Sequence, residues 1–297
     1  MQNSFPGHGT FRFVLITACW IGTLTAQGPS KITFSDNFSS GPSPLWSNYT
    51  GNWTAVDGQY FAQSPNDNPL TYTGLPFVLA DYTLTVKTVI GDGGIWLRSK
   101  EGNPYGQYIL LVLGGDNYGQ GARGGDAGNS IYFATASQSG INQVRNVVTP
   151  GDTYVVTVKA QGDTYSVFLN GATTPVATLT DSSMPYGQVG LYDDQPNTAV
   201  GGFGAPTTFS NFQLSGNAIA PQVSSVIPNA GKPGTVVTIR GVNLQSATGV
   251  TFNGATAQFT QSYPGTDIQA TVPSGATSGP IVVTTPLGAA NTFTVLQ

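Results

Sequence analysis

The sequence is a succession of short apolar runs separated by turns. In residues 153–171, TYVVTVKAQGDTYSVFLNG, side chains of similar character recur at every second position on both sides of a Gly-Asp turn, which predicts a β-hairpin. No stretch of a dozen residues combines helical periodicity with the absence of Gly and Pro. The chain is therefore predicted to be all-β.

Further strand-like segments precede and follow this hairpin. They are residues 82–90, 129–136, 175–180, 187–193 and 207–215. With 39% hydrophobic residues the chain is too apolar for disorder. Many short antiparallel strands in about 185 residues favour a two-sheet β-sandwich.

The N-terminus resembles an export signal. Arg12 precedes the apolar run FVLITACWIGTLTA, which is too short to span a membrane and typical of a signal-peptide core. Cleavage after Ala26 would define residues 1–26 as the signal peptide. Alternatively, ITAC resembles a bacterial lipobox, which would leave a lipid on Cys19. Both interpretations predict a secreted or cell-surface protein.

This cleavage would remove the only histidine, His8, and the only cysteine, Cys19. The remaining chain would have no disulfide, no histidine-based catalytic group and no zinc site of the usual ligands. Loss of Arg12 also changes the formal charge from −4 to −5. An acidic chain of this kind is not expected to bind nucleic acid.

The order of motifs in residues 27–215 resembles the concanavalin A/laminin-G-like jelly rolls. The matching pieces are FSDNFSS, GNWTAVDGQYFAQ, GGIWLRS with YGQYILLVL, VKAQGDTYSVFLNG, and GQVGLYDD with TTFSNFQL. Within that group the chain is similar to the 3-keto-disaccharide hydrolase-like, family 16 glycoside hydrolase-like branch. The resemblance implies a jelly roll and action on, or binding of, glycosides.

Residues 216–220 are expected to form a linker open to proteases. Residues 221–297 resemble an IPT/TIG domain, through GTVVTIRGVNL, VTFNG, VPSGATSGPIVV and the final FTV in that order. This resemblance implies a smaller immunoglobulin-like β-sandwich that serves as a spacer or an adhesive module. The predicted architecture is thus a jelly-roll sandwich followed by a second, smaller sandwich.

The acidic residues do not form a glycosidase pattern. Such enzymes use two carboxylates about 5 to 10 Å apart, and the resemblance to family 16 would imply Glu-x-Asp-x-x-Glu on one strand. The chain has one glutamate, Glu101, and no two acidic residues spaced i, i+2. A catalytic pair of carboxylates contributed by two different strands is an alternative that the sequence does not exclude. The expectation is therefore no catalytic residue.

No cofactor is expected, although calcium remains possible. Oxygen ligands suffice for calcium, and the loop YDDQPN offers Asp193 and Asp194 as candidate ligands. A G-x-G-x-x-G match at residues 119–124 leads into a strand instead of a helix, so no nucleotide site is expected.

Aromatic residues provide the candidate binding site. Flat rings stack on the apolar faces of sugars. Alternation along residues 95–98 places Ile95 and Leu97 on a buried face and Trp96 and Arg98 on the outer, concave face. The candidate ligand-binding residues are Trp96, Arg98, Tyr108, Tyr132 and Tyr192.

Three functions follow from these features. The leading one is a non-catalytic protein that binds a glycan or another cell-surface ligand. The second is a glycoside-acting enzyme of the 3-keto-disaccharide hydrolase-like family, and the third is a structural component of an extracellular matrix. No nucleic acid, nucleotide or membrane-spanning segment is expected in any of them.

Overall fold

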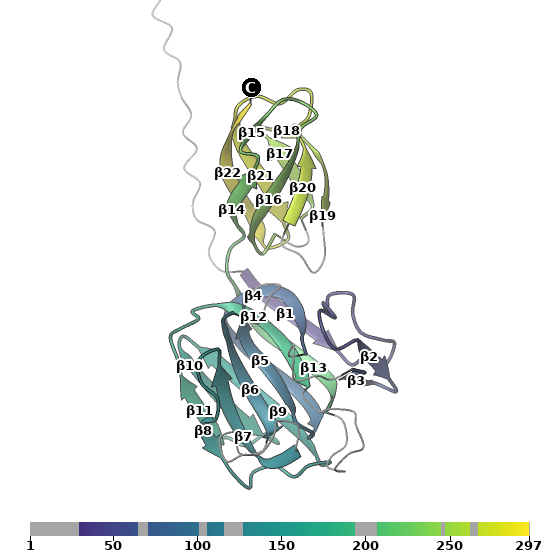
Figure 1. The fold of residues 1–297 in the computed structure, drawn as a ribbon, viewed down its shortest axis with the longest axis vertical. Coiled ribbons are helices and arrows are strands. Elements are labelled where there is room, and N and C mark those ends of the chain that lie inside the picture. The colour runs from purple at the N-terminus through teal and green to yellow at the C-terminus, as the bar shows by residue number, and fades with distance from the viewer. Residues whose placement is uncertain are drawn as a thin grey trace, which may run out of the picture.

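The computed structural model describes residues 30–64, 71–100, 106–115, 127–193, 207–244, 247–261 and 267–296. Every regular element in these residues is a β-strand, so the all-β prediction is confirmed. Figure 1 shows two lobes that follow one another along the chain. Each lobe has its own hydrophobic core. The predicted signal peptide lies outside the described residues.

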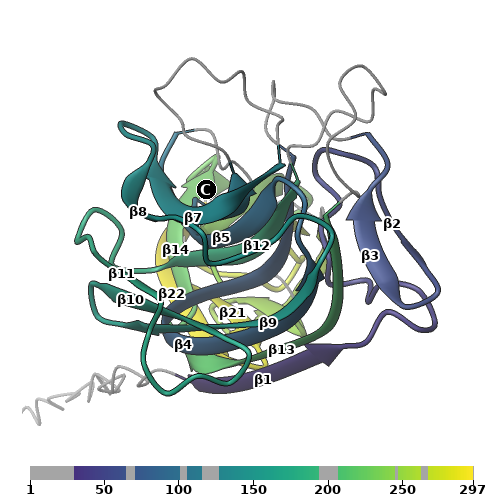
Figure 2. The ribbon, with the colours of Figure 1, turned by 90° about the horizontal axis from the view of Figure 1, so that it is seen from below.

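The first domain is a sandwich of two layers that share one strand, β4 (Thr73–Val89). One layer continues from β4 through β12 (Gly187–Asp193), β5 (Gly93–Ser99), β6 (Tyr108–Gly115), β7 (Ala127–Thr135) and β8 (Ile141–Val144). The other layer holds β1 (Ser30–Asp36), β2 (Trp53–Val56), β3 (Gln59–Ala62), β9 (Thr153–Gln161), β10 (Thr164–Leu169), β11 (Ala177–Thr180) and β13 (Thr208–Ala218). Figure 2 shows these two layers facing each other.

Strand β4 crosses from one layer to the other because it is 17 residues long. Its first half pairs with β12, and its second half pairs with β9 and β13. Between these halves, Ala80 and Asp81 form the corner of the sandwich, where the pairing with β13 shifts register. The corner fixes the angle between the layers, and it is the place where Arg98 binds.

The core between the layers comes from alternating strand positions. Ile95 and Leu97 of β5, Leu111 of β6 and Phe133 of β7 point into it and are fully buried. The predicted hairpin is confirmed as β9 and β10, which contribute Val158 and other buried side chains. At about 25 cal/mol per Å² of buried apolar surface, this core is the main source of the domain's stability.

The second domain contains two smaller sheets. One consists of β14 (Gln222–Ile227), β16 (Val236–Val242), β20 (Asp267–Thr271) and β19 (Gln258–Gln261). The other consists of β15 (Ala230–Gly231), β22 (Gly288–Leu296), β21 (Gly279–Thr285), β17 (Gly249–Phe252) and β18 (Ala255–Thr256). Ile239, Phe252 and Ile281 lie fully buried between them, as expected for a small sandwich.

The boundary between the domains differs from the predicted one. Strand β13 continues to Ala218, which pairs with Ser30 and Leu79, so most of the predicted linker is part of the first domain's sheet. The connection before β14 is residues 219–221. The Ile219 amide donates to the carbonyl of Val78 at 3.1 Å. The connection is therefore shorter than the predicted linker, and its accessibility to proteases stays a prediction.

Asn243 of the second domain forms hydrogen bonds across this junction. Its side-chain oxygen accepts from the Val78 amide at 2.8 Å, and its side-chain nitrogen donates to the carbonyls of Val78 and Ile219 at 3.2 and 2.7 Å. The residue is 1% exposed and has a φ of 53°, a conformation that asparagine tolerates better than most residues. Ser30 adds a hydrogen bond to the carbonyl of Leu287 at 3.0 Å. The two domains are thus held together by buried polar contacts.

Candidate functional site

A second apolar cluster lies on the face of β12, β5, β6 and β7 that points away from the core. We call it the aromatic cluster, and it contains Tyr72, Trp96, Leu110, Val112, Tyr132, Ala134 and Tyr192, with Tyr108 packed against it. Strand alternation explains the separation, because Trp96 lies between Ile95 and Leu97, both of which face the core. Four of the five predicted binding residues therefore come together on one face.

The rings of the aromatic cluster meet edge to face. The centroid of Trp96 lies 5.1 Å from that of Tyr108, 5.7 Å from that of Tyr192 and 5.7 Å from that of Tyr72. The indole nitrogen of Trp96 donates to the carbonyl of Thr71 at 3.2 Å. This arrangement fixes the orientation of the Trp96 ring, since edge-to-face pairs are favourable and the polar tip is bonded.

Glycines make room for these rings. A Cβ atom on Gly74 would collide with the Tyr72 hydroxyl, and one on Gly115 would lie 2.6 Å from the Tyr132 ring. The Tyr72 hydroxyl is within hydrogen-bond distance of Ser99 Oγ (3.1 Å) and donates to Gln188 Oε1 (3.2 Å). The sequence did not single out Tyr72, because it precedes β4 and no alternation pattern marks its face.

The rings at the centre of the aromatic cluster are buried, and those at its edge are partly exposed to solvent. Trp96 is 0% exposed, and Tyr132 and Tyr192 are also buried. Tyr108 is partly buried, while Tyr49 is 42% exposed and packs edge to face on Tyr72 at 6.3 Å. A ligand that binds this face without rearrangement would therefore contact Tyr49 and Tyr108, with Trp96 supporting Tyr108 from below.

Arg98 does not share the face of Trp96, which corrects the prediction from alternation. Strand β5 has a β-bulge: Trp96 pairs with Leu110 and Arg98 pairs with the adjacent Ile109, so Leu97 is an extra residue. The bulge turns Arg98 toward the core side. Its Cζ lies 5.1 Å from the centroid of the Tyr165 ring, which belongs to the core.

Arg98 binds three backbone carbonyls at the corner of the sandwich. Its guanidinium donates to Met184 O, to Ala80 O at 2.5 Å and to Gly162 O at 2.9 Å. The side chain is 0% exposed. These carbonyls come from the segment before β12, the corner of β4 and the β9–β10 turn, so Arg98 joins three parts of the domain.

Two buried tyrosines near Arg98 predict weakening of the fold at high pH. Burial raises the pKa of Tyr82 and Tyr165 well above the usual value, with Arg98 opposing this rise in both. Above pH ~10 the unfolded chain releases tyrosine protons that the folded chain keeps. The free energy of unfolding should therefore fall as pH rises above 10, and Tyr165→Phe should make that fall shallower.

Urea unfolding of the wild type and Tyr165→Phe between pH 8 and pH 11.5 measures this effect. The comparison at pH 8 is the control, since both states keep the proton there and any difference reflects packing alone. Parallel pH profiles for the two proteins would contradict a contribution from Tyr165.

The candidate calcium ligands are only partly described. Asp193 ends β12 and is 0% exposed, with its amide donating to Thr71 Oγ1 at 2.7 Å, while Asp194 lies outside the described residues. Within the described ranges, no three acidic, histidine or cysteine side chains cluster as a metal site would require. The same part of the chain has no helix of the length and apolarity that a membrane crossing needs.

Two acidic residues occur at the same end of neighbouring strands. Asp193 is the Cα partner of Gly93, and Asp92 directly precedes Gly93. Asp92 is 5% exposed. The register thus places near one another two acids that are 101 residues apart in the sequence.

Comparison with known proteins gives a family for the second domain. Residues 221–295 match the family model of the IPT/TIG domain. The search among curated proteins returned no match. Among solved structures, the chain is similar to the carbohydrate-binding module CBM66 from Bacillus subtilis, with 16% identity over 57% of this chain and 93% of the module, at a TM-score of 0.40.

Two further similar structures are of LamA and of a transglycosylase. A LamA variant from Z. galactanivorans, solved with laminaritriose and laminaritetraose, is 13% identical over 64% of this chain and 100% of its own, at a TM-score of 0.40. The Crh5 transglycosylase in complex with NAG is 14% identical over 65% of this chain and 86% of its own, at a TM-score of 0.42. Similarity at this level does not carry over a ligand or a reaction.

Proposed function

We propose that this chain is an exported, non-catalytic protein whose jelly-roll domain binds carbohydrate, with the IPT/TIG domain as spacer or contact module. The observation that carries the proposal is the aromatic cluster. A two-sheet sandwich needs one core, and this domain has a second layer of aromatic rings on the opposite face. Tyr49 and Tyr108 provide ring surface at the edge of that layer.

Aromatic rings at such an edge suit sugar binding. A pyranose presents an apolar face of C–H groups to a ring and hydroxyls around its rim, and tyrosine combines a flat ring with a polar tip. The residues of the aromatic cluster are all uncharged, in a chain with only 8% charged residues. A neutral or weakly charged glycan fits this environment best.

The test is a glycan array with the full chain, followed by calorimetry on the best ligand. We expect Tyr49→Ala and Tyr108→Ala each to weaken binding about fivefold to tenfold, the effect of losing one stacked ring. Val155→Ala, which changes an exposed side chain of the other layer, is the matched control and should bind normally.

Urea unfolding of each variant separates binding from stability. If a fully folded Tyr49 or Tyr108 variant binds the glycan as tightly as the wild type, the glycan does not bind at that tyrosine. If no glycan in the array binds, the carbohydrate-binding proposal is wrong, and a structural role in a matrix becomes the better account.

A second candidate is a glycoside-acting enzyme, including the 3-keto-disaccharide hydrolase-like activity. The observation that favours it is that the backbones of Asp92 and Asp193 lie at the same end of the neighbouring strands β5 and β12, since such enzymes use two carboxylates as acid and base. Assays with 3-keto-glycosides and ordinary glycosides test it. Activity that Asp92→Asn and Asp193→Asn both abolish without unfolding the chain would replace the binding proposal with this one.

A further inference from the structure

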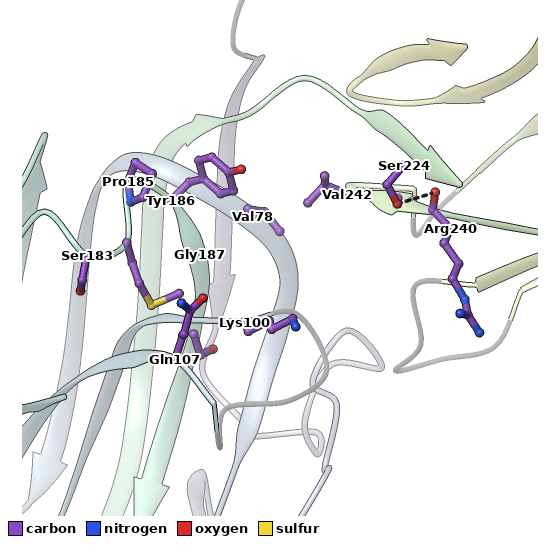
Figure 3. Close-up of a pocket in the computed structure, with 13 residues that line it drawn as sticks. Val78, Lys100, Gln107, Ser183, Pro185, Tyr186, Gly187, Ser224, Arg240 and Val242 are labelled. Atoms are coloured by element: carbon purple, nitrogen blue, oxygen red, sulfur yellow. Dashed lines mark hydrogen bonds between the residues drawn. The ribbon is translucent and has the colours of Figure 1, made fainter. Parts of the chain in front are cut away.

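The junction of the two domains holds a pocket of about 570 Å³, within the size range of small-molecule sites. The first domain contributes Val78, Ser99, Lys100, Gln107 and the segment from Ser183 to Gly187, and the second contributes Ser224, Arg240, Gly241 and Val242. Figure 3 shows these two groups on opposite sides of the gap, with the Arg240 side chain extending along its own domain. Neither domain alone forms the pocket.

Contacts already described hold two of the residues that line this pocket. Val78 lines the pocket and is bonded on both its amide and carbonyl to Asn243, the neighbour of Val242. Met184 lines it too, and its carbonyl accepts from the buried Arg98. Lining residues that are already held in place lose little conformational entropy when a ligand binds, which favours recognition.

The two charged side chains that line the pocket are both basic, in a chain that is acidic overall. Of the ten lysines and arginines, Arg12 and Arg123 lie outside the described residues, and two of the remaining eight, Lys100 and Arg240, line this pocket from opposite walls. No acidic side chain lines it among the described residues. Asp267 forms an ion pair with Arg240 and accepts from its Nε at 3.1 and 3.2 Å, so the charge of Arg240 is partly compensated while both of these bonds use Nε alone.

The rest of the lining suits a sugar. Tyr186 is 45% exposed and offers ring surface beside Pro185, while Ser183, Ser224 and Gln107 supply hydroxyl and amide groups. A uronic acid unites in one unit a pyranose ring for stacking, hydroxyls for hydrogen bonds and a carboxylate for an arginine or lysine. We propose that this pocket binds a carboxylated oligosaccharide, with Tyr186 against a sugar ring and Lys100 and Arg240 on its carboxylates.

This site does not depend on the aromatic cluster for its ligand, although Ser99 lies between the two. The test uses trimers of galacturonic acid and of mannuronic acid as probes, with the full chain in calorimetry at low salt. We expect Lys100→Gln and Arg240→Gln each to weaken the better probe about tenfold or more, since each removes a charge-assisted contact. Tyr186→Ala should weaken it as well.

Matched controls keep the test specific. Lys232→Gln removes an exposed cation of the second domain outside the pocket and should leave binding unchanged. Binding should weaken when the salt concentration rises to 0.5 M, because screening acts on exposed charges. Tyr49→Ala should not affect the uronate trimers, which separates failure of this site from failure of the aromatic cluster.

Three outcomes would overturn the inference. The first is that neither trimer binds the folded wild-type chain. The second is that Lys232→Gln weakens binding as much as Lys100→Gln and Arg240→Gln do, which would indicate a diffuse charge effect. The third is that a neutral galactose trimer or a triglutamate peptide binds as tightly as the uronate trimers, since the pocket would then not recognise a carboxylated sugar.

Discussion

Replacing Arg98 with alanine should destabilise the first domain by about 3 to 5 kcal/mol. The substitution leaves the carbonyls of Met184, Ala80 and Gly162 without their donor and opens a cavity under the Tyr165 ring. Hydrogen bonds from a charged group are among the strongest in proteins, and buried acceptors without a donor are costly. Urea unfolding followed by tryptophan fluorescence measures the loss.

Two variants give this prediction its control. Lys87→Ala removes an exposed cation from β4 and should change stability by no more than about 0.5 kcal/mol. Arg98→Lys keeps the charge but loses the planar fork of donors, so it should fall between the wild type and Arg98→Ala. A stability of Arg98→Ala close to that of the wild type would mean that the corner does not depend on the guanidinium.

Replacing Asn243 should uncouple the two domains. Asn243→Gly removes three buried hydrogen bonds at the junction while keeping a backbone that tolerates a φ of 53°, and should cost about 2 to 3 kcal/mol. We expect the wild type to unfold in a single transition and the variant to unfold in two. Calorimetry detects the separation, and limited proteolysis should reveal new cleavage within residues 219–221.

Asn243→Ala serves as the companion variant. It loses the same hydrogen bonds and adds strain, since alanine adopts a positive φ less readily than glycine or asparagine, so it should be less stable than Asn243→Gly by about 1 kcal/mol. Equal stability of the two variants would show that backbone strain plays no part. If both Asn243 variants unfold in one transition, unchanged from the wild type, Asn243 does not couple the two domains.

The strand pattern predicted much of the first domain. Ile95 and Leu97 face the core and Trp96 faces outward, as alternation indicated. Trp96, Tyr108, Tyr132 and Tyr192 belong to segments that are far apart in the sequence, and the sheet brings them together because β5, β6, β7 and β12 are neighbours. Alternation alone predicts which face of the sheet a side chain occupies, provided that the strand is regular.

The wrong predictions concern irregular strand positions and contacts between residues that are far apart in the sequence. Arg98 was misplaced because one bulge shifts every later residue of β5 to the other face, and no Gly or Pro between Ile95 and Ser99 signals it. The linker was misplaced because SGNA, which is typical of a flexible connection, is here the last part of β13. Asn243 gave no signal, since its partners Val78 and Ile219 lie far from it in the sequence.

The sharing of β4 between both layers determines when this domain can be completed as the chain emerges from the ribosome. The two halves of β4 can pair only after β9, β12 and β13 have been synthesised. Strand β1 also pairs with β13. The first domain therefore stays open until residue 218 has been made, with long apolar strand edges unpaired. Unpaired apolar strand edges favour association between chains, so the period before residue 218 is the one in which aggregation competes most with folding.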